Sequence, residues 1–279
     1  MSIGDTIYSL RKDSGLTQKD LAENLGVNFQ TVSKWERGLC CPDVMLLPLL
    51  AEIFGVSTDT LLGYNAGEPK HSDYDRLYNG EEYYWGVDPT PFCYSILPHL
   101  PTGRRPRLLE IGCGEGRDAV FFARCGCDVS AYDISSAGKR KTEQLAARAF
   151  VNVHAFCADM ISFVPRETYD VVYASRALHY VPKEMRRSFF SNYKACTLPG
   201  GIHAFLVIVD KPYIPTAPDN DEHGDLMVSG ELFTYYSDWE LLLIEENVID
   251  CKSSGVPHKH CVNLMIAKKP LSEIVTTLK

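Results

Sequence analysis

The sequence lacks the patterns by which several classes of protein are recognised. No apolar run reaches roughly 18 residues, so no transmembrane helix and no membrane partner are expected. The first residues, Met-Ser-Ile-Gly-Asp, contain neither a basic region nor an apolar signal core, so we predict a cytoplasmic protein without an export signal. Positive charge is also scarce: 28 Lys and Arg stand against 36 Asp and Glu. The net charge of −8 argues against a surface that coats nucleic acid.

Cysteine is present, but without the spacing of a zinc ribbon. None of the ten cysteines forms a Cys-x-x-Cys pair. Several stand inside apolar stretches, and we interpret them as reduced, partly buried thiols. The sequence therefore predicts no metal site.

The length of 279 residues favours about two domains of ~150 residues. Residues 64–73 are polar and are interrupted by Gly67 and Pro69, which is typical of a linker. We therefore predict a small helical domain at 1–63, a linker at 64–73 and a larger domain at 74–279.

Residues 1–63 contain five short helical patterns. Ile3, Ile7 and Leu10 fall at helical spacing in the first. Thr17, with Asp20 three residues later, predicts a capping box at the start of the second. Helices joined by a turn that contains glycine are typical of a helix-turn-helix. The remaining helices are predicted at 29–37, 43–54 and 57–62.

The segments Leu16-Thr17-Gln18, Leu25-Gly26-Val27 and Thr31-Val32-Ser33-Lys34-Trp35-Glu36-Arg37-Gly38 resemble the Cro/phage-repressor (XRE) family. This resemblance implies a DNA-binding domain whose third helix enters the major groove. Five Lys/Arg against eight Asp/Glu in 1–63 leave a protein–protein role as the alternative, and a homodimer is expected to be needed for firm DNA binding. The resemblance assigns base contacts to Asn28, Gln30 and Thr31, and phosphate contacts to Gln18, Ser33 and Lys34.

The larger domain is organised around Leu108-Leu109-Glu110-Ile111-Gly112-Cys113-Gly114-Glu115-Gly116. An apolar run that ends in alternate glycines is typical of a buried parallel strand whose turn passes close to a ligand. A helical stretch follows, and free N–H groups at its start favour an anion. Asp133 ends a second apolar stretch 21 residues past Gly112, where a carboxylate can accept hydrogen bonds from both ribose hydroxyls of a nucleoside. Dinucleotide sites prefer Gly-x-Gly-x-x-Gly, whereas this chain has Gly-x-Gly-x-Gly.

The stretch Leu109-Glu110-Ile111-Gly112-Cys113-Gly114-Glu115-Gly116-Arg117 resembles motif I of the class I S-adenosylmethionine (SAM) methyltransferases. The resemblance implies SAM as cofactor and a Rossmann-like sheet of seven strands with the last antiparallel. The alternative is a structural strand–turn–helix without a ligand. The residues assigned to the cofactor are Trp85, Glu110, Gly112, Cys113, Gly114, Gly116, Arg117, Asp133, Ile134, Asp159, Met160 and Ser175.

From residue 107 onward strand-like and helical segments alternate, which predicts a parallel sheet covered on both faces. The predicted fold class is therefore α/β, a Rossmann-like methyltransferase sheet that follows a small all-α helix-turn-helix domain. Leu198-Pro199-Gly200-Gly201 is expected to be a structural turn before the fifth strand. Strands are predicted at 107–111, 128–133, 151–157, 169–174, 201–209, 240–246 and 261–268, and helices at 92–100, 117–125, 136–149, 182–197 and 231–238.

A closer resemblance covers most of residues 78–268. Tyr84-Trp85-Gly86, the glycine turn, and Gly230-Glu231-Leu232 with Tyr235-Tyr236-Ser237-Asp238-Trp239 resemble the tellurite-resistance (TehB-type) methyltransferases. The resemblance implies small, soft substrates such as tellurite, selenite or thiols. The aromatic segment Tyr83-Tyr84-Trp85 is expected to fold over the cofactor, where a ring suits the positive sulfonium. Simple packing on the sheet is the alternative for each ring.

The substrate-side candidates are Arg176, His179 and His260, with His258 beside the last. Arg176 and His179 follow the fourth strand, where ligands bind in open α/β sheets. Arg176 can contact an oxyanion and His179 can act as a base or donor, although His179 can equally be a structural histidine. His258 and His260 alternate at a strand start, so only one is expected to face the pocket, and no third metal ligand lies nearby in sequence.

The sequence thus favours a SAM-dependent methyltransferase for a small-molecule substrate, a tellurite- or selenite-like oxyanion or a thiol, that is fused to a DNA-binding domain. The alternative is a transcription regulator whose methyltransferase-like domain senses SAM or a toxic ion without turnover. Methylation of DNA is a weaker hypothesis, because Ala174-Ser175-Arg176 replaces the Asn/Asp-Pro-Pro-Tyr/Phe-like segment of the enzymes that methylate DNA amino groups.

Overall fold

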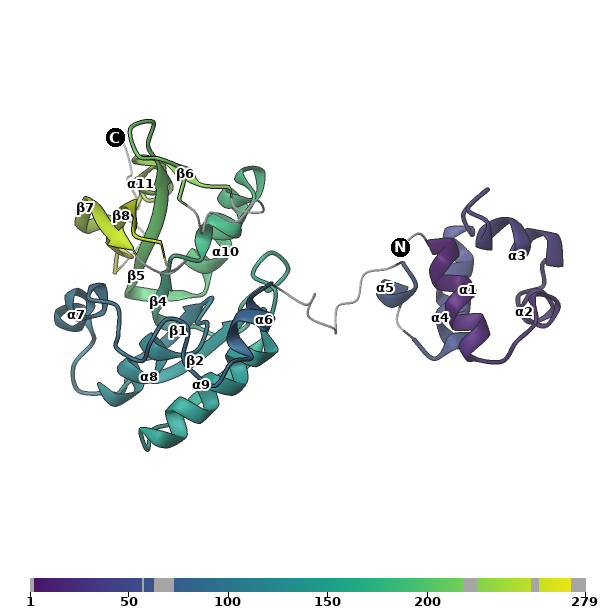
Figure 1. Cartoon of the computed structure of the whole chain (residues 1–279), viewed down its shortest axis with the longest axis horizontal. Helices are drawn as coiled ribbons and strands as arrows, with labels where there is room; N and C mark the ends of the chain where they lie inside the picture. The colour runs from purple at the N-terminus through teal and green to yellow at the C-terminus, as the bar shows by residue number, and fades with distance from the viewer. Residues whose placement is uncertain (1–2, 57, 63–72, 218–224, 252–255, 272–279) are drawn as a thin grey trace, which may run out of the picture. The chain divides into compact units, whose positions relative to one another are not determined.

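The computed structural model describes residues 3–56, 58–62, 73–217, 225–251 and 256–271. Contacts divide the chain into two compact units, Met1–Pro69 and Lys70–Lys279, whose elements are labelled in Figure 1. The predicted linker lies outside the described residues except for Asp73, and so does Ser57, the expected start of the fifth helix. Within the described part of the chain, no helix is both long and apolar enough to cross a membrane.

The first unit is a bundle of short helices. The capping box of Thr17 and Asp20 is confirmed: Thr17 Oγ1 accepts from the backbone N–H of Asp20, and the Asp20 carboxylate accepts from that of Thr17. The apolar residues at helical spacing form its core, with Ile7, Val32 and Trp35 buried. The predicted fourth helix is in part a 3₁₀ turn that Asp43 caps. The elements are α1 (Ile3–Asp13), α2 (Gln18–Leu25), α3 (Phe29–Glu36), η1 (Val44–Leu46), α4 (Leu47–Phe54) and α5 (Thr58–Leu61).

The second unit contains one mixed sheet in the order β3-β2-β1-β4-β5-β8-β7. The pairs among β1 to β5 are parallel, and β8 is antiparallel to both β5 and β7, which confirms the predicted fold class. A short strand, β6, also pairs with β5, and the sequence pattern did not predict it. The strands are β1 (Arg107–Ile111), β2 (Asp128–Asp133), β3 (Val153–Cys157), β4 (Tyr169–Ser175), β5 (Thr197–Asp210), β6 (Met227–Val228), β7 (Glu240–Cys251) and β8 (His258–Lys268).

The strands β5, β7 and β8 differ most from the expected bounds, whereas β3 begins two residues later and β4 ends one residue later than expected. The expected glycine turn lies within β5 as an irregularity, because Tyr169 pairs with Thr197 whereas Val171 pairs with Ile202. β7 and β8 pair further than predicted, up to Cys251 opposite His258. The added residues are 247–251 (Asn-Val-Ile-Asp-Cys) in β7 and 258–260 (His-Lys-His) in β8, and neither set shows the alternation of apolar and polar residues that would predict a strand.

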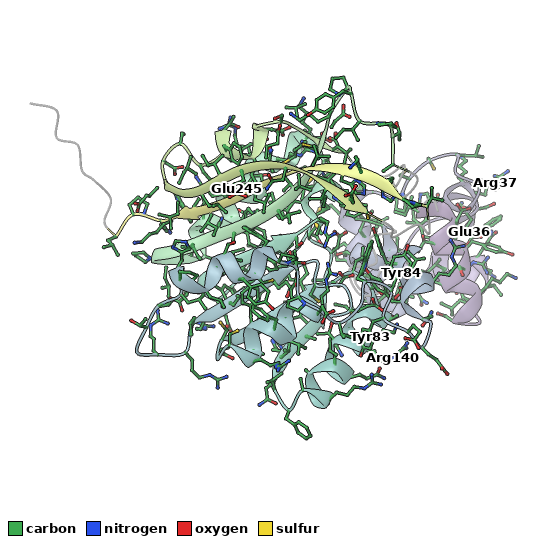
Figure 2. All side chains as sticks on the ribbon, turned by 60° about the vertical axis from the view of Figure 1, so that its left-hand side comes forward. Glu36, Arg37, Tyr83, Tyr84, Arg140 and Glu245 are labelled. Atoms are coloured by element: carbon green, nitrogen blue, oxygen red, sulfur yellow. The ribbon has the colours of Figure 1, made fainter. Side chains whose placement is uncertain are left out.

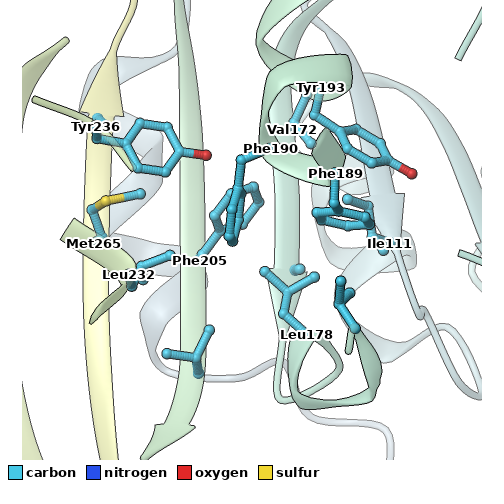
Figure 3. Packing of buried hydrophobic residues seen from close by; sticks show 14 of the residues in the cluster. Ile111, Val172, Leu178, Phe189, Phe190, Tyr193, Phe205, Leu232, Tyr236 and Met265 are labelled. Carbon is cyan, nitrogen blue, oxygen red and sulfur yellow. The ribbon is translucent and has the colours of Figure 1, made fainter. Parts of the chain in front are cut away.

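Helices cover both faces of the sheet. The apolar sides of α7 and α8 meet one face, and those of α10 and α11 meet the other. Figure 3 shows part of the second cluster, in which Phe190 of α10 packs against both Phe205 and Tyr236. Burial of each such ring contributes about 1.5–3 kcal/mol. The helices are α6 (Asp73–Tyr78), α7 (Phe92–Ile96), α8 (Arg117–Arg124), α9 (Ser136–Arg148), α10 (Arg186–Ala195) and α11 (Glu231–Thr234), with 3₁₀ turns η2 (Leu97–His99), η3 (Leu178–Tyr180) and η4 (Lys183–Met185).

The strand β7 forms one end of the sheet order and exposes several acidic side chains. Glu245, labelled in Figure 2, lies midway along it. Charged residues on an edge strand oppose pairing with another sheet. The exposed acidic residues of β7 are Glu240, Glu245, Glu246 and Asp250.

Candidate functional site

The turn after β1 is built from glycines in a left-handed conformation. Gly112, Gly114 and Gly116 have φ of 66°, 55° and 86°. A β-carbon on Gly112 would lie 2.5 Å from the β-carbon of Ala177, and one on Gly116 would lie 2.5 Å from Thr142. Side chains are thus excluded on both backbone and steric grounds, and the turn brings bare backbone to the carboxyl end of the sheet.

Asp133 holds this turn from the end of β2. Its two oxygens accept hydrogen bonds from the backbone N–H groups of Gly114 (2.8 Å) and Ser135 (2.9 Å). Burial raises the pKa of Asp133, although both backbone bonds act against the shift. Each carboxylate oxygen keeps further acceptor capacity. Ile134 follows directly and is half-buried.

A segment from α6 to Trp85 covers the glycine turn. The Tyr78 hydroxyl would lie 3.1 Å from a β-carbon on Gly114, and it accepts a hydrogen bond from the Trp85 indole at 2.9 Å. Tyr83 and Tyr84, both labelled in Figure 2, precede Trp85. The predicted aromatic cover therefore lies beside the turn, joined by Tyr78, which the sequence analysis did not assign.

A buried ion pair fastens this cover. Lys141 Nζ of α9 lies 2.8 Å from Glu115 Oε1, and the other Glu115 oxygen accepts from the backbone N–H of Trp85 at 3.1 Å. Lys141 also donates to the carbonyl oxygen of Glu82, and its ammonium lies 5.1 Å from the centre of the Tyr83 ring. The sequence analysis missed Lys141, because nothing in the pattern of α9 separates it from the neighbouring surface lysine.

Arg117 and Asp118 begin α8, and Arg117 Nε lies 3.9 Å from Asp118 Oδ1 in a mostly buried ion pair. Asp118 is buried and accepts three hydrogen bonds, from the Thr90 N–H (2.7 Å), the Thr90 hydroxyl (2.8 Å) and the Tyr173 hydroxyl (2.8 Å). Arg117 donates to the Trp85 carbonyl oxygen at 2.8 Å. Both residues therefore tie the segment before β1 to the glycine turn.

Two buried polar atoms near the carboxyl end of the sheet have no hydrogen-bond partner among the residues that the structure describes. They are Glu110 Oε2 and Ser175 Oγ. Burial raises the pKa of Glu110 well above its ordinary value, and the charge of Asp118 adds to the effect. Because buried polar groups are normally hydrogen-bonded, these atoms are suited to a polar ligand. Cys113, which lies within the glycine turn, is buried.

Asp159 and Met160 follow β3. Asp159 Oδ1 accepts from the backbone N–H of Ile161 at 2.9 Å. The terminal methyl of Met160 would lie 3.7 Å from a β-carbon on Gly112, so this side chain borders the glycine turn. The structure thus brings the residues after β1, β2 and β3 to one end of the sheet.

Arg176 follows β4 in an unusual backbone conformation. Its φ is 55°, and its N–H donates to the Leu206 carbonyl oxygen at 2.8 Å. Burial lowers the pKa of Arg176, and the positive charge of Arg117 lowers it further. His179, in η3, is buried, with its ring centroid 4.2 Å from that of Tyr180.

His258 and His260 lie on the same face of β8, so the premise that they alternate between faces was wrong. Both belong to β8, and their Nε2 atoms lie 2.9 Å apart, because side chains two residues apart share a strand face. His260 is buried and borders a small pocket with Asp210 and Lys211. Cys251, opposite His258 on β7, joins them.

The surface of α3 carries most of the residues assigned to DNA. Gln30 and Lys34 are exposed, and Thr31 and Ser33 are half-buried. Asn28 caps the helix, because its side-chain oxygen accepts from the Gln30 N–H at 2.9 Å. The Gln18 amide donates to Glu36, labelled in Figure 2, at 2.7 Å instead of pointing freely outward.

Comparison with known proteins identifies both units. The family described as "Tellurite resistance protein TehB" matches residues 99–256, and the family described as "Helix-turn-helix" matches residues 7–61. Hemagglutinin 1 of Eikenella corrodens is 29% identical over 167 residues, 59% of this chain and 55% of that protein. The probable S-adenosyl-L-methionine-dependent methyltransferase TehB of Haemophilus influenzae is 23% identical over 142 residues, 51% of this chain and 49% of that protein.

The HTH-type transcriptional regulator ImmR of Bacillus subtilis is 40% identical over 63 residues, 23% of this chain and 50% of that protein. The chain therefore spans about half the length of the curated relatives it matches. The crystal structure of TehB from Haemophilus influenzae superimposes with a TM-score of 0.57 at 20% identity, over 72% of this chain and 67% of that one, which shows a shared fold. Since the matched segment exceeds half of the chain, the protein belongs to the TehB family and joins a SAM methyltransferase domain of that family to an N-terminal helix-turn-helix domain of the XRE type.

Proposed function

We propose that this protein transfers a methyl group from SAM to a small, soft nucleophile, a tellurite- or selenite-like oxyanion or a thiol. The observation that carries the proposal is Arg176, a half-buried residue in a left-handed backbone conformation whose guanidinium feels the positive charge of Arg117. Such a conformation is costly for a residue other than glycine and is concentrated at ligand sites. Two positive side chains at the carboxyl end of a parallel sheet favour an anionic ligand.

The cofactor site is supported by the donor and acceptor groups around the glycine turn. Asp133 is suited to accept from the ribose hydroxyls, and Glu110 and Ser175 offer buried polar atoms that the described residues leave unpaired. Trp85 and Tyr78 place aromatic rings beside the turn, and aromatic rings are suited to stabilise a positive sulfonium. SAM supplies the methyl group on that sulfonium.

The protein's own part in the reaction is to orient the acceptor and to exclude water. A bond forms from the nucleophile to the methyl carbon as the carbon–sulfur bond breaks, and the electron pair of that bond stays on sulfur, so no strong acid is needed. Arg176 binds an oxyanion acceptor. With a thiol acceptor, His179 removes the proton before or during attack. Wild-type turnover of a thiol should then rise with pH as the His179 imidazole loses its proton and becomes able to act as a base.

Turnover of SAM with tellurite, selenite and simple thiols tests the proposal. Arg176→Ala should raise KM for the oxyanions and change SAM affinity little, because uniform substrate binding appears in KM. Arg124→Ala, which removes an exposed arginine from α8, is the matched control. Tight SAM binding without product from any acceptor would refute the proposed methyltransferase activity and favour a regulator that senses SAM or a toxic ion.

We further propose that the helix-turn-helix domain binds DNA as part of a homodimer. The exposed Gln30 and Lys34 on one side of α3 support this role, since Gln can contact a base edge and Lys a phosphate. Phe29 is 52% exposed at the start of the same helix and was not assigned from the sequence. An apolar ring there can contact a thymine methyl. Selection from random DNA should yield a two-fold symmetric site, and failure to select any sequence would favour a protein partner.

A further inference from the structure

We propose that Cys251, His258 and His260 form a binding site for a divalent cation, with Zn²⁺ as the best fit. One thiol sulfur and two imidazole nitrogens of these residues all lie within 4.8 Å of one another. The cluster lies on β7 and β8, whereas the glycine turn follows β1. The proposal does not depend on methyl transfer.

The strand pairing brings the three side chains to one face. Cys251 is directly opposite His258 in the antiparallel pair, where β-carbons lie about 4.5–5.5 Å apart. His260 follows two residues later on the same face. Lys259 projects to the other face, where its Nζ lies 2.6 Å from Asp250 Oδ1. Its positive charge is therefore turned away from the cluster.

The hydrogen bonds of His258 prepare it to ligate a metal. Its Nδ1 lies 2.7 Å from the Val256 carbonyl oxygen, which can only accept, so Nδ1 carries a hydrogen and the Nε2 lone pair of neutral His258 accepts a hydrogen bond from His260 Nε2, 2.9 Å away. A bound ion would replace this hydrogen bond, and the hydrogen on His260 Nε2 would move to Nδ1 or to solvent. Metal-ligating histidines commonly donate their second nitrogen to a backbone carbonyl in this way.

The spacing of the nitrogens is close to that of a zinc centre. The Nε2 atoms of His258 and His260 lie 2.9 Å apart. Two nitrogens on a tetrahedral zinc, each at about 2.0–2.1 Å, would lie about 3.3 Å apart. The two Nε2 atoms would need to move apart by only a few tenths of an ångström for both to ligate the ion.

The donor set and exposure select the kind of ion. One thiolate and two imidazoles favour Zn²⁺ over the oxygen-seeking Mg²⁺ or Ca²⁺. Three protein ligands leave a fourth tetrahedral position for water or another ligand. Cys251 and His258 are half-buried and His260 is buried, so the site is lined by protein and reachable from solvent.

The test titrates the full chain, reduced and freed of metal with a chelator, with Co²⁺ alone and then Zn²⁺. We expect one Co²⁺ per chain, a thiolate-to-cobalt charge-transfer band and its loss when Zn²⁺ displaces the cobalt. Cys251→Ser should abolish the band and weaken Zn²⁺ binding about 100-fold or more, since even indirect partners of a ligand matter 10–100-fold. His260→Ala should weaken binding to a similar degree.

Matched controls separate this site from unspecific binding by thiols. Cys125→Ser and His154→Ala remove an exposed thiol and an exposed imidazole elsewhere, and both variants should bind as the wild type does. Far-UV circular dichroism checks folding, and His258→Gln at a half-exposed position serves if Cys251→Ser or His260→Ala is unfolded. Equal Zn²⁺ affinity in wild type and a folded cluster variant, or a wild-type cobalt spectrum without a thiolate band, would overturn the proposal.

Discussion

Loss of either partner of the buried ion pair between Lys141 and Glu115 should lower the free energy of unfolding strongly. Lys141→Met leaves the Glu115 carboxylate buried with the Trp85 N–H as its remaining described hydrogen bond. Glu115→Gln keeps an acceptor for Trp85 but leaves the ammonium with the Glu82 carbonyl oxygen. Breaking a buried pair by removing one partner costs about 3–5 kcal/mol, because an uncompensated charge stays out of water. The double variant removes both charges, so it should lose less than the sum, with a coupling energy of about 2–3 kcal/mol.

The helix α9, which contains Lys141, also supplies a control: an ion pair with the same N···O distance whose side chains are exposed to solvent. Lys139 Nζ lies 2.8 Å from Glu143 Oε1, the same separation as in the buried pair. Its side chains are 35% and 49% exposed, against 4% and 2% for Lys141 and Glu115. An exposed pair one turn apart on a helix should show a coupling of only about 0.3–0.5 kcal/mol.

Urea unfolding of the four members of each cycle, followed by circular dichroism, gives both coupling energies. Calorimetry with SAM adds a second measurement, because the buried pair holds the segment that covers the glycine turn. If the two cycles return the same coupling, burial is not the source of the effect and the reasoning fails.

Other consequences of the structure can be measured in the same way. Burial lowers the pKa of His203 to about 3, below the ordinary value of 6.5. Below pH ~6.5 the unfolded chain therefore takes up a proton that the folded chain excludes. Stability should fall by up to ~1.4 kcal/mol per pH unit towards pH 3, and in urea unfolding His203→Gln should reduce this slope. Gly112→Ala should abolish SAM binding in calorimetry, because a methyl group would meet another 2.5 Å away; Gly126→Ala, also at positive φ but with open space around it, should bind SAM normally. In DNA-binding assays with a selected site, Gln30→Ala should reduce specific binding more than non-specific binding. Lys34→Ala should weaken both and flatten the salt dependence, and equal effects of the two variants would contradict these roles.

Local patterns predict the centre of the sheet well. β1 and β2 have the predicted bounds because each is a short apolar run with a clear end, one at Gly112 and the other at Asp133. The capping box at Thr17 follows equally from local sequence. Such elements need no knowledge of distant contacts.

Contacts between distant segments explain what the sequence left out. Lys141 is indistinguishable in the sequence from the exposed Lys139, and only packing against the aromatic cover makes it a buried cation. Cys251 lies seven residues before His258, and the antiparallel pairing of the end of β7 with the start of β8 brings them together. His179 and Arg176 were placed at the end of β4 by topology, although φ at Arg176 is not a property that a sequence pattern reveals.

The cover of the glycine turn also determines where the chain can be shortened. The TehB match begins at residue 99, and a truncated chain that began there would keep all the described strands. It would lose Asp75, whose carboxylate accepts from the Ser135 hydroxyl at 2.6 Å and the Ala137 N–H at 3.0 Å at the start of α9. It would also lose Trp85 and leave Lys141 beside open solvent. The segment from residue 73 to 98 is therefore part of the folding unit. A chain truncated where the family match begins would have a sheet whose glycine turn is no longer covered.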